Sequence, residues 1–272
     1  MPIVLRVEKG VGVISTMYEI NLSSSLFPAL QDRSVIQSSI GAVLKNSASQ
    51  YGNTEALVEV TQDGKLGCRW NYDSLYQDSL KLAFALSGRF KKGERIVIWS
   101  PNSPEWVLIE YATALSGIVL VTANPSLQEK ELRYIIENSH AVGLFLVQEF
   151  RGNPMAEIAQ KATSNNNIIR EILDITDHAA LFKNSYGNIN LPNVSPGYPA
   201  QIQYTSGTTG FPKGALLSHL GLVNNADYYA SRCCVTNAST WINIMPMFHT
   251  SGCGMVTLGC LNSGCRMVSR AR

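Results

Sequence analysis

The feature that most constrains the fold is a set of three short apolar runs separated by helical segments. The runs occupy residues 95–99, 118–122 and 142–147, and each is a near-continuous apolar stretch without strict alternation of apolar and polar positions. Strands of a parallel sheet have this composition because helices cover both of their faces. The pattern therefore predicts an α/β fold made of mostly parallel sheets covered by helices.

Capping signals predict where the helices begin. A Ser or Asp before an apolar helical pattern can accept a hydrogen bond from a free N–H group of the first turn. We expect the helix that follows Asp73 to run to about residue 90. The expected caps are Ser34, Asp73, Ser103 followed by Pro104, a capping box at residues 126–129, and Ser218.

A β-hairpin is predicted near the N-terminal end of this region. Asp63-Gly64 lies between two strand-like runs, residues 56–60 and 66–70. Asp-Gly is a strong hairpin signal because Gly adopts positive φ angles without steric cost.

The composition is that of an ordinary soluble globular protein. The chain has 272 residues, 45% of them hydrophobic, and a formal net charge of +2. This charge predicts no strong attraction to nucleic acid or to a membrane surface. The most apolar stretch, residues 106–123, contains Glu110 and Gly117, and it fits a buried helix and strand better than a transmembrane segment.

The six cysteines and the N-terminal residues bear on the cellular compartment. No two cysteines form a C-x-x-C pair, so neither a disulfide framework nor a zinc site is expected, and most thiols are expected to be buried. Residues 1–12 lack the long apolar region of a secretory signal. We expect a cytoplasmic protein, with mitochondrial or peripheral membrane association left open.

Residues 204–214 form the segment that points to chemistry. Their sequence is Tyr-Thr-Ser-Gly-Thr-Thr-Gly-Phe-Pro-Lys-Gly. Small residues let the backbone N–H groups approach an anion, four hydroxyls add donors, and Lys213 supplies a cation. The spacing fits neither a Walker phosphate loop nor a nucleophile elbow around Ser206. The segment therefore predicts a phosphate-binding loop of another kind.

This loop resembles the signature motif of the adenylate-forming superfamily, which includes acyl- and aryl-CoA synthetases, luciferases and peptide-synthetase adenylation domains. The resemblance implies that the loop holds the β- and γ-phosphates of ATP, with its glycines giving backbone access and Thr208 nearest to a magnesium ion. The residues implied to bind the nucleotide are Thr205, Ser206, Gly207, Thr208, Thr209, Gly210 and Lys213.

A second block supports the same resemblance. Residues 245–252, Met-Pro-Met-Phe-His-Thr-Ser-Gly, are similar to the family motif in which a His borders the acyl pocket and the path of the CoA thiol. The resemblance therefore implies that His249 and Lys213 are the catalytic residues. It extends over residues 34–268 and includes the upstream segments at 75–106 and 117–125.

The implied reaction is ATP-dependent activation of a carboxylic acid, by resemblance a medium- or long-chain fatty acid. The acid becomes an acyl-adenylate and then an acyl-CoA, with ATP, Mg²⁺ and CoA as cofactor and cosubstrates. Two alternatives remain open. One is an aryl- or cyclic-acid–CoA ligase, and the other is a non-catalytic nucleotide-binding fragment.

The expected domain organisation is incomplete relative to the family. Residues 1–33 are an expected N-terminal extension, and residues 34–272 are expected to form part of an N-terminal AMP-binding domain. The family's adenine and ribose motifs and its small C-terminal domain have no counterpart in the sequence. We therefore expect a missing C-terminal half as a partner, unpaired strand edges at the end of the chain, and an isolated chain that is inactive.

Overall fold

A computed structural model describes residues 33–164, 166–183, 190–205 and 212–270. The chain divides into two compact units, Met1–Ile36 and Gln37–Arg272. Of the first unit only residues 33–36 are described, and they form neither helix nor strand. The second unit contains all the elements described below.

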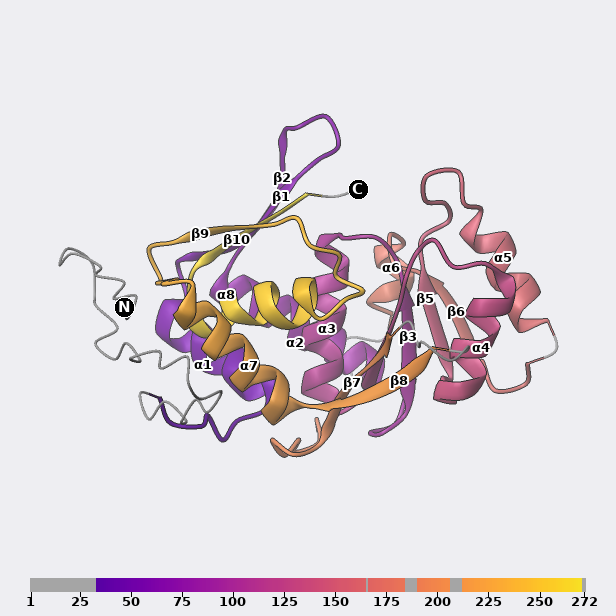
Figure 1. The fold of residues 1–272 in the computed structure, drawn as a ribbon, viewed down its shortest axis with the longest axis horizontal. Coiled ribbons are helices and arrows are strands. Elements are labelled where there is room, and N and C mark those ends of the chain that lie inside the picture. Colours follow the sequence, from indigo (N-terminus) through magenta and orange to yellow (C-terminus); the bar gives the residue numbers. More distant parts are fainter. Residues whose placement is uncertain (1–32, 165, 184–189, 206–211, 271–272) are drawn as a thin grey trace, which may run out of the picture. The chain divides into compact units, whose positions relative to one another are not determined.

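A six-stranded sheet forms one half of this unit (Figure 1). Its first five strands run parallel, and the last runs antiparallel to its neighbour. The expectation of a mostly parallel sheet is therefore confirmed. In order across the sheet, the strands are β6 (Glu171–Asp174), β5 (Gly143–Leu146), β3 (Arg95–Trp99), β4 (Val119–Ala123), β7 (Pro199–Thr205) and β8 (Lys213–Ser218).

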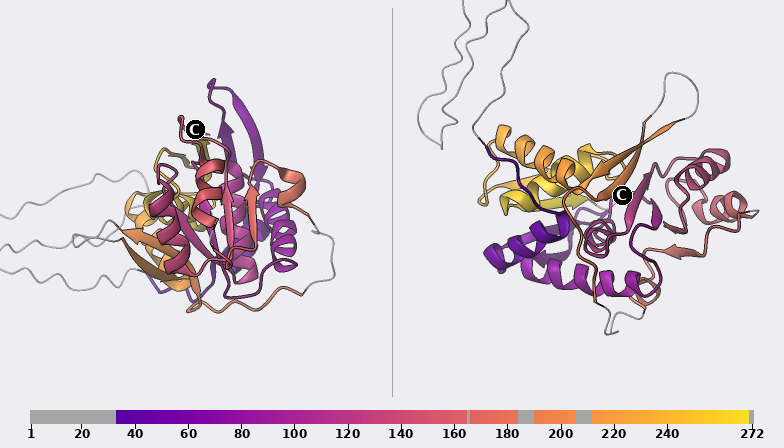
Figure 2. Two further views of the ribbon diagram at one scale, coloured as in Figure 1. Left: turned by 90° about the vertical axis from the view of Figure 1, so that its right-hand side faces the viewer. Right: turned by 90° about the horizontal axis from the view of Figure 1, so that it is seen from below.

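Helices cover both faces of the parallel strands (Figures 1 and 2). On one face, α4 (Glu129–Ser139) and α5 (Met155–Thr163) pack on a core of buried aliphatic side chains from β3, β4 and β5. On the other lie α2 (Tyr72–Ser87) and α3 (Pro104–Ser116). Eleven residues of α3 are buried, including Glu110, because the helix lies between the two sheets of the unit. The short helix α6 (His178–Leu181) follows β6.

A second, four-stranded sheet joins the two ends of the unit. The predicted hairpin forms two antiparallel strands at one side of this sheet, and two further strands continue it parallel to the first hairpin strand. Nearby are α1 (Ile40–Tyr51), α7 (His219–Arg232), a π-helix (Ser251–Thr257) and α8 (Leu258–Ser263). In order, the strands are β2 (Leu66–Asn71), β1 (Glu55–Val60), β10 (Arg266–Arg270) and β9 (Thr240–Asn243).

The last strand, β10, is an inner strand of this sheet. It pairs with β1 on one side and with β9 on the other. The expected unpaired edge is therefore not at β10 itself but at its parallel neighbour β9, on which Ile242 is 62% exposed. The edge strands of the two described sheets are β2, β9, β6 and β8.

Three expected helix starts are displaced along the chain. The cap of α1 is Ser39 instead of Ser34, and the cap of α2 is Asn71 instead of Asp73. The capping box of α4 begins at Gln128 instead of residue 126. In each case the cap is the residue with extended backbone directly before the helix. Helix α2 also ends earlier than expected, at Ser87.

Two other expected caps are confirmed. Ser103 accepts a hydrogen bond from the Trp106 N–H, with Pro104 at the first helical position. Ser218 accepts one from the Gly221 N–H at the start of α7. The thiols are less buried than expected, because Cys68, Cys233 and Cys234 are exposed while the other three are buried.

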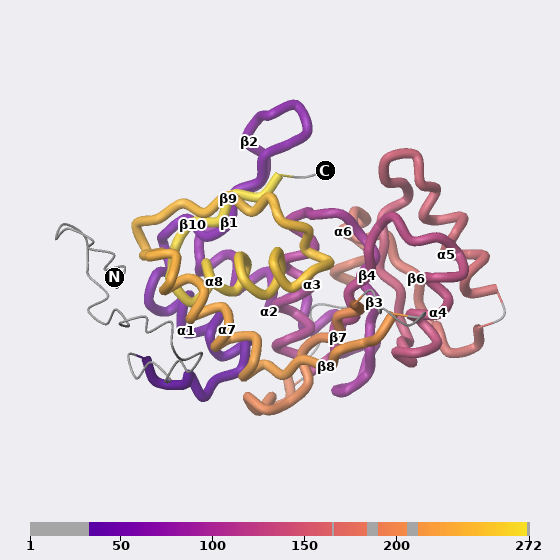
Figure 3. The backbone as a smooth tube through the Cα atoms, viewed as in Figure 1, coloured from indigo at the N-terminus to yellow at the C-terminus, as the bar shows by residue number. Residues whose placement is uncertain are grey.

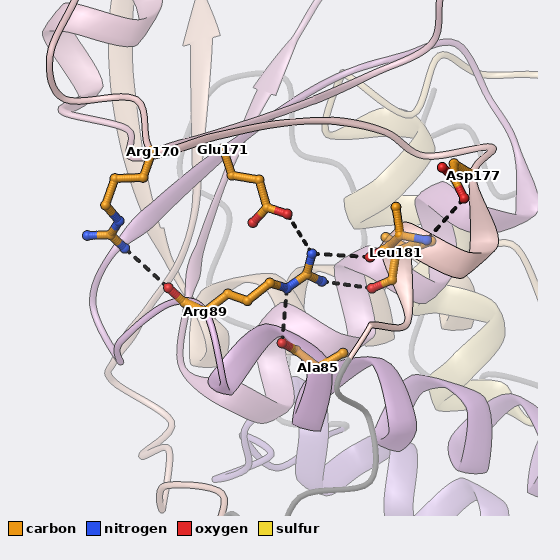
Figure 4. Close-up of polar contacts among 7 residues, drawn as sticks. Ala85, Arg89, Arg170, Glu171, Asp177 and Leu181 are labelled. Atoms are coloured by element: carbon orange, nitrogen blue, oxygen red, sulfur yellow. Dashed lines mark hydrogen bonds and ion pairs between the residues drawn. The ribbon is translucent and has the colours of Figure 1, made fainter.

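Arg89, just after α2, connects three elements (Figure 4). Its guanidinium donates to the Ala85 carbonyl at 3.1 Å, to Glu171 Oε1 at 2.8 Å and to the Leu181 carbonyl at 2.7 Å. The side chain is only 12% exposed. A planar guanidinium can satisfy several acceptors at once, so this one residue holds β6 and α6 against the end of α2.

Candidate functional site

The phosphate-loop motif begins and ends on two paired strands. Strand β7 ends at Thr205, β8 begins at Lys213, and these two residues are partners in the antiparallel pair. Both are exposed, and the Thr205 hydroxyl donates to the Lys213 carbonyl at 3.4 Å. The structure therefore brings two of the predicted residues together. The other five, Ser206, Gly207, Thr208, Thr209 and Gly210, lie outside the described residues.

The mouth of the loop, which we define as Thr205 and Lys213, lies at the carboxyl end of a parallel strand. Strand β7 pairs with β4, which in turn pairs with β3, and all three run in the same direction. Their carboxyl ends therefore meet at one edge of the sheet. In open α/β sheets, ligands bind in the crevice outside this edge.

Hydrogen bonds hold the second motif, residues 245–252, at the same edge of the sheet. Asn102 follows β3; its amide donates to the Met245 carbonyl and accepts from the Met247 N–H, each at 2.8 Å. The Thr122 hydroxyl on β4 donates to the Phe248 carbonyl at 2.8 Å. Side chains at the ends of two parallel strands therefore hold the backbone that carries His249.

The ring of His249 is exposed, and its tautomer follows from its neighbours. Nδ1 accepts a hydrogen bond from the Ser251 N–H at 3.1 Å and lies 2.9 Å from the Ser251 hydroxyl. A backbone N–H can only donate, so in the neutral ring Nδ1 is unprotonated and the proton is on Nε2. His249 can therefore offer a hydrogen-bond donor to a ligand oxygen from Nε2.

A tight turn and a π-helix follow His249. The Gly252 N–H donates to the His249 carbonyl at 2.9 Å, and a Cβ at position 252 would overlap the Pro246 carbonyl. Only glycine fits this close approach of backbone. Short π-helical segments occur often at functional sites, and this one begins at Ser251.

A buried chain of polar side chains links β7 to the π-helix. Gln201 Nε2 donates to Glu110 Oε1 at 2.6 Å, and Gln203 Nε2 donates to Gln201 Oε1 at 2.9 Å. Gln203 Nε2 also lies 3.1 Å from Cys253 Sγ, which is 3.4 Å from the His249 carbonyl oxygen. The two sequence motifs are therefore coupled through Gln203 and Cys253.

Glu110 is the acidic end of this chain. Burial raises the pKa of Glu110 to about 8, and the hydrogen bond from Gln201 offsets part of the rise. Among the described residues, Glu110 Oε2 has no hydrogen-bond partner. The carboxyl group is therefore protonated at neutral pH and does not place a charge beside the site.

Sequence reasoning missed the residues that support the site. Asn102, Thr122, Gln203 and Cys253 had no motif of their own, although Asn102 and Thr122 occupy the carboxyl ends of strands that were expected. Position at a strand end is the signal that could have selected them. His219 is fully buried, and its Nδ1 accepts a hydrogen bond from the Ile40 N–H at 3.4 Å. Burial lowers the pKa of His219 to about 4.

No group of three or more His, Cys, Asp or Glu side chains in the described part of the chain could hold a metal ion. None of the helices in the described ranges has the length and apolar character needed to cross a membrane.

Comparison with known proteins identifies sequence relatives. The model of the family described as AMP-binding enzyme matches residues 44–272. A mitochondrial medium-chain acyl-CoA ligase of Rattus norvegicus is 30% identical over 229 residues, which are 74% of this chain and 37% of the relative. The human protein of the same name is 29% identical over 264 residues, 84% of this chain and 42% of the relative. The chain thus spans less than half the length of these relatives.

Solved structures share the fold. A long-chain-fatty-acid–CoA ligase of Archaeoglobus fulgidus matches with a TM-score of 0.75 and 23% identity, covering 89% of this chain and 48% of that one. The N-terminal domain of FACL13 from Mycobacterium tuberculosis matches with a TM-score of 0.72 and 23% identity, covering 86% and 57%. The described fold is therefore that of the N-terminal domains of these proteins.

Proposed function

The chain belongs to the AMP-binding enzyme family, and we propose that it supplies the triphosphate- and acid-binding part of a carboxylic acid–CoA ligase. The observation that carries this proposal is the meeting of two motifs at one sheet edge. Thr205 and Lys213 are paired at the mouth of the loop, and the His249 segment is bonded to the ends of the neighbouring strands.

The reaction we propose has two steps. A carboxylate oxygen attacks the α-phosphorus of ATP, and the bond from that phosphorus to pyrophosphate breaks, giving an acyl-adenylate. The sulfur of the CoA thiol, as thiolate, then attacks the acyl carbon, and the acyl–oxygen bond to AMP breaks. Both steps develop negative charge on oxygen, so positioned donors and cations favour them.

Each residue has a role suited to its place. The Lys213 ammonium and the Thr205 hydroxyl are exposed at the mouth and can contact oxygens of the departing pyrophosphate. The His249 Nε2–H can donate to the acyl oxygen as charge develops there. We propose that Ser206, Gly207, Thr208, Thr209 and Gly210 complete the phosphate-binding loop.

A magnesium ion accompanies ATP in the proposed reaction. Mg²⁺ bound to nucleotides keeps several waters and is held mainly by the substrate phosphates together with one or two carboxylates. We propose Thr208 as the protein oxygen nearest to it. When bound, the ion would neutralise charge on the triphosphate.

The proposed acid is a medium- or long-chain fatty acid, which the names of the rat and human relatives support. An aryl- or cyclic-acid substrate is the second candidate for the same site. We further propose that residues 1–33 form an extension, that 34–272 form part of the AMP-binding domain, and that a C-terminal half completes the enzyme. The proposed compartment is the cytoplasm, although both of these relatives are mitochondrial.

Isotope exchange between pyrophosphate and ATP tests the first step. The purified 272-residue chain is assayed with MgATP and octanoate, with benzoate in place of octanoate, and with no acid. For the chain alone we expect saturable ATP binding with little exchange, and for a chain extended by the missing half we expect exchange that depends on octanoate. Exchange that depends on benzoate instead would favour the aryl-acid alternative, and ATP binding without exchange in both forms would favour a nucleotide-binding fragment.

A further inference from the structure

One helix, α4, is hydrogen-bonded to the chain on both sides of the loop mouth, and its backbone can be followed in Figure 3. The Tyr134 hydroxyl donates to the Pro212 carbonyl at 3.0 Å, immediately before β8. The Tyr204 hydroxyl, one residue before the end of β7, donates to Asn138 Oδ1 at 2.8 Å. Tyr134 and Asn138 are four residues apart, so they share one face of the helix. That face therefore contacts the chain where it enters the loop and where it returns.

The two tyrosine rings reinforce this contact. Tyr134 and Tyr204 pack edge to face, with ring centroids 6.4 Å apart and planes inclined at 74°. Beneath the Tyr204 ring lies Gly214 on the returning strand. A Cβ at position 214 would lie 3.2 Å from the Tyr204 ring and 3.1 Å from Ile202. The glycine that ends the motif thus leaves room for the ring that reaches α4.

Helix α4 is a rigid platform for such a contact. Its first turn is closed by a capping box between Gln128 and Glu131. Leu132 and Ile136 are fully buried and Ile135 is nearly so, and all three belong to the core cluster beneath the parallel strands. A side chain on this helix therefore has a fixed position relative to the sheet.

The tyrosine hydroxyl on β7 stays a donor across the physiological pH range. Burial, together with the neighbouring Tyr134, raises the pKa of Tyr204 to about 12. The group therefore remains protonated, and its hydrogen bond to Asn138 does not depend on pH near neutrality.

We propose that Tyr134 and Asn138 are positioning residues that hold the two strands at the separation and orientation in which Thr205 and Lys213 meet a triphosphate. They act through Tyr204 and Pro212 and do not themselves touch the nucleotide. This inference rests on the proposed function for the identity of the ligand. The contacts that carry it lie entirely in the described strands and in α4.

Nucleotide titration of two single-residue variants tests the proposal. In Tyr134→Phe the ring stays and only the hydroxyl is lost; in Asn138→Leu the amide is replaced by an apolar group of similar size. Calorimetric titration of the 272-residue chain with MgATP should show dissociation constants raised about 5-fold in each variant, as expected for one lost hydrogen bond. Binding of AMP, which lacks the β- and γ-phosphates, should change less than 2-fold.

Tyr229→Phe is the matched control, because Tyr229 is 46% exposed on α7 and stacks on Trp241 away from α4. It should leave both dissociation constants unchanged. Equal losses of ATP and AMP binding in Tyr134→Phe would indicate general loss of structure and would overturn the proposal. So would ATP binding as tight as in the unmodified chain.

A second measurement needs no nucleotide. Amide hydrogen exchange of residues 203–205 and 213–215 should be faster in Tyr134→Phe than in the unmodified chain, and unchanged in Tyr229→Phe. Unchanged exchange in Tyr134→Phe would contradict the role of α4. If the unmodified chain fails to bind ATP, the proposed function fails, and the exchange rates still decide whether α4 holds the mouth.

Discussion

Glu110 is a carboxylic acid in a buried environment that disfavours its ionised form. It is 2% exposed on a helix that lies between two sheets, and the only described hydrogen bond to its carboxyl group comes from Gln201. The neighbouring titratable groups are Tyr111 and Cys253. Burial raises the pKa values of both, and the nearby Glu110 raises them further. No described cation stabilises the ionised form, so the neutral acid is the native state.

The elevated pKa of Glu110 predicts a specific dependence of stability on pH. Its pKa rises from 4.5 to about 8 on folding, so the native state binds more protons than the unfolded state between these values. The contribution of Glu110 to the free energy of unfolding is complete below pH 4.5. It is lost as the pH rises from 4.5 through about 8. The slope is about 1.4 kcal/mol per pH unit within that window.

Replacement of Glu110 by glutamine should remove this dependence. Glu110→Gln keeps an oxygen that can accept from Gln201 but cannot ionise. The free energy of unfolding, measured by urea denaturation from pH 5 to pH 8.5, should fall less steeply with pH in Glu110→Gln than in the unmodified chain. Glu157→Gln, at an exposed position on α5, serves as control and should follow the unmodified chain. Parallel curves for Glu110→Gln would contradict the buried neutral acid.

The site illustrates what residue patterns can and cannot predict. Thr205, Lys213 and His249 were identified because a long ordered motif contains them. Gln203 and Cys253 are in contact although they lie 50 positions apart in the chain, and no local pattern predicts such a contact. Residues with a supporting role therefore emerge only when the fold is known.

At the scale of single elements, local patterns predicted the presence of helices better than their ends. The βαβ alternation from residue 95 to 146 is confirmed, yet the caps of α1, α2 and α4 are shifted by two to five residues. Several polar residues precede these helices, so the local sequence predicts that a cap is present but not which residue provides it. The π-helix at 251–257 had no signal in the local sequence pattern.

At the scale of elements, we predict that the Arg89 guanidinium is needed to hold β6 and α6 in place. Arg89→Lys keeps the charge but cannot reach three acceptors in one plane. We expect a loss of about 1–3 kcal/mol in the free energy of unfolding, as for hydrogen bonds of a charged group. Amide hydrogen exchange in residues 171–181 should be faster in Arg89→Lys than in the unmodified chain. The measurements are thermal denaturation and hydrogen exchange.

Arg69→Lys is the control for this change, because Arg69 forms an ion pair with Glu55 that leaves its side chain 50% exposed. Such surface pairs contribute little, so the variant should be nearly neutral. If Arg89→Lys were as stable as Arg69→Lys, the guanidinium would not be what holds β6 and α6 in place.

At the scale of the whole molecule, the second sheet was the least predictable part. Strand β1 pairs with β10 in register Leu57 to Met267, so segments about 210 positions apart form one sheet. Register over such a distance is set by packing and not by local sequence. The hairpin of β1 and β2 was predicted from Asp63-Gly64, but its addition to β10 and β9 was not.

The family assignment and the fold agree at this scale. The chain spans under half of the length of the rat and human relatives. Among the described residues, β7 and β8 pair at Thr205 and Lys213, and the His249 segment is bonded to Thr122 on β4. We therefore propose that the 272-residue chain recognises a triphosphate through Lys213.

The most direct measurement of this claim is calorimetric titration of Lys213→Ala with MgATP and with AMP. The account predicts ATP binding weakened about 10-fold or more, because a charge-assisted contact is lost, with AMP binding nearly unchanged. Lys45→Ala, at an exposed position on α1, should bind both nucleotides as the unmodified chain does. ATP binding by Lys213→Ala as tight as by Lys45→Ala would contradict the account.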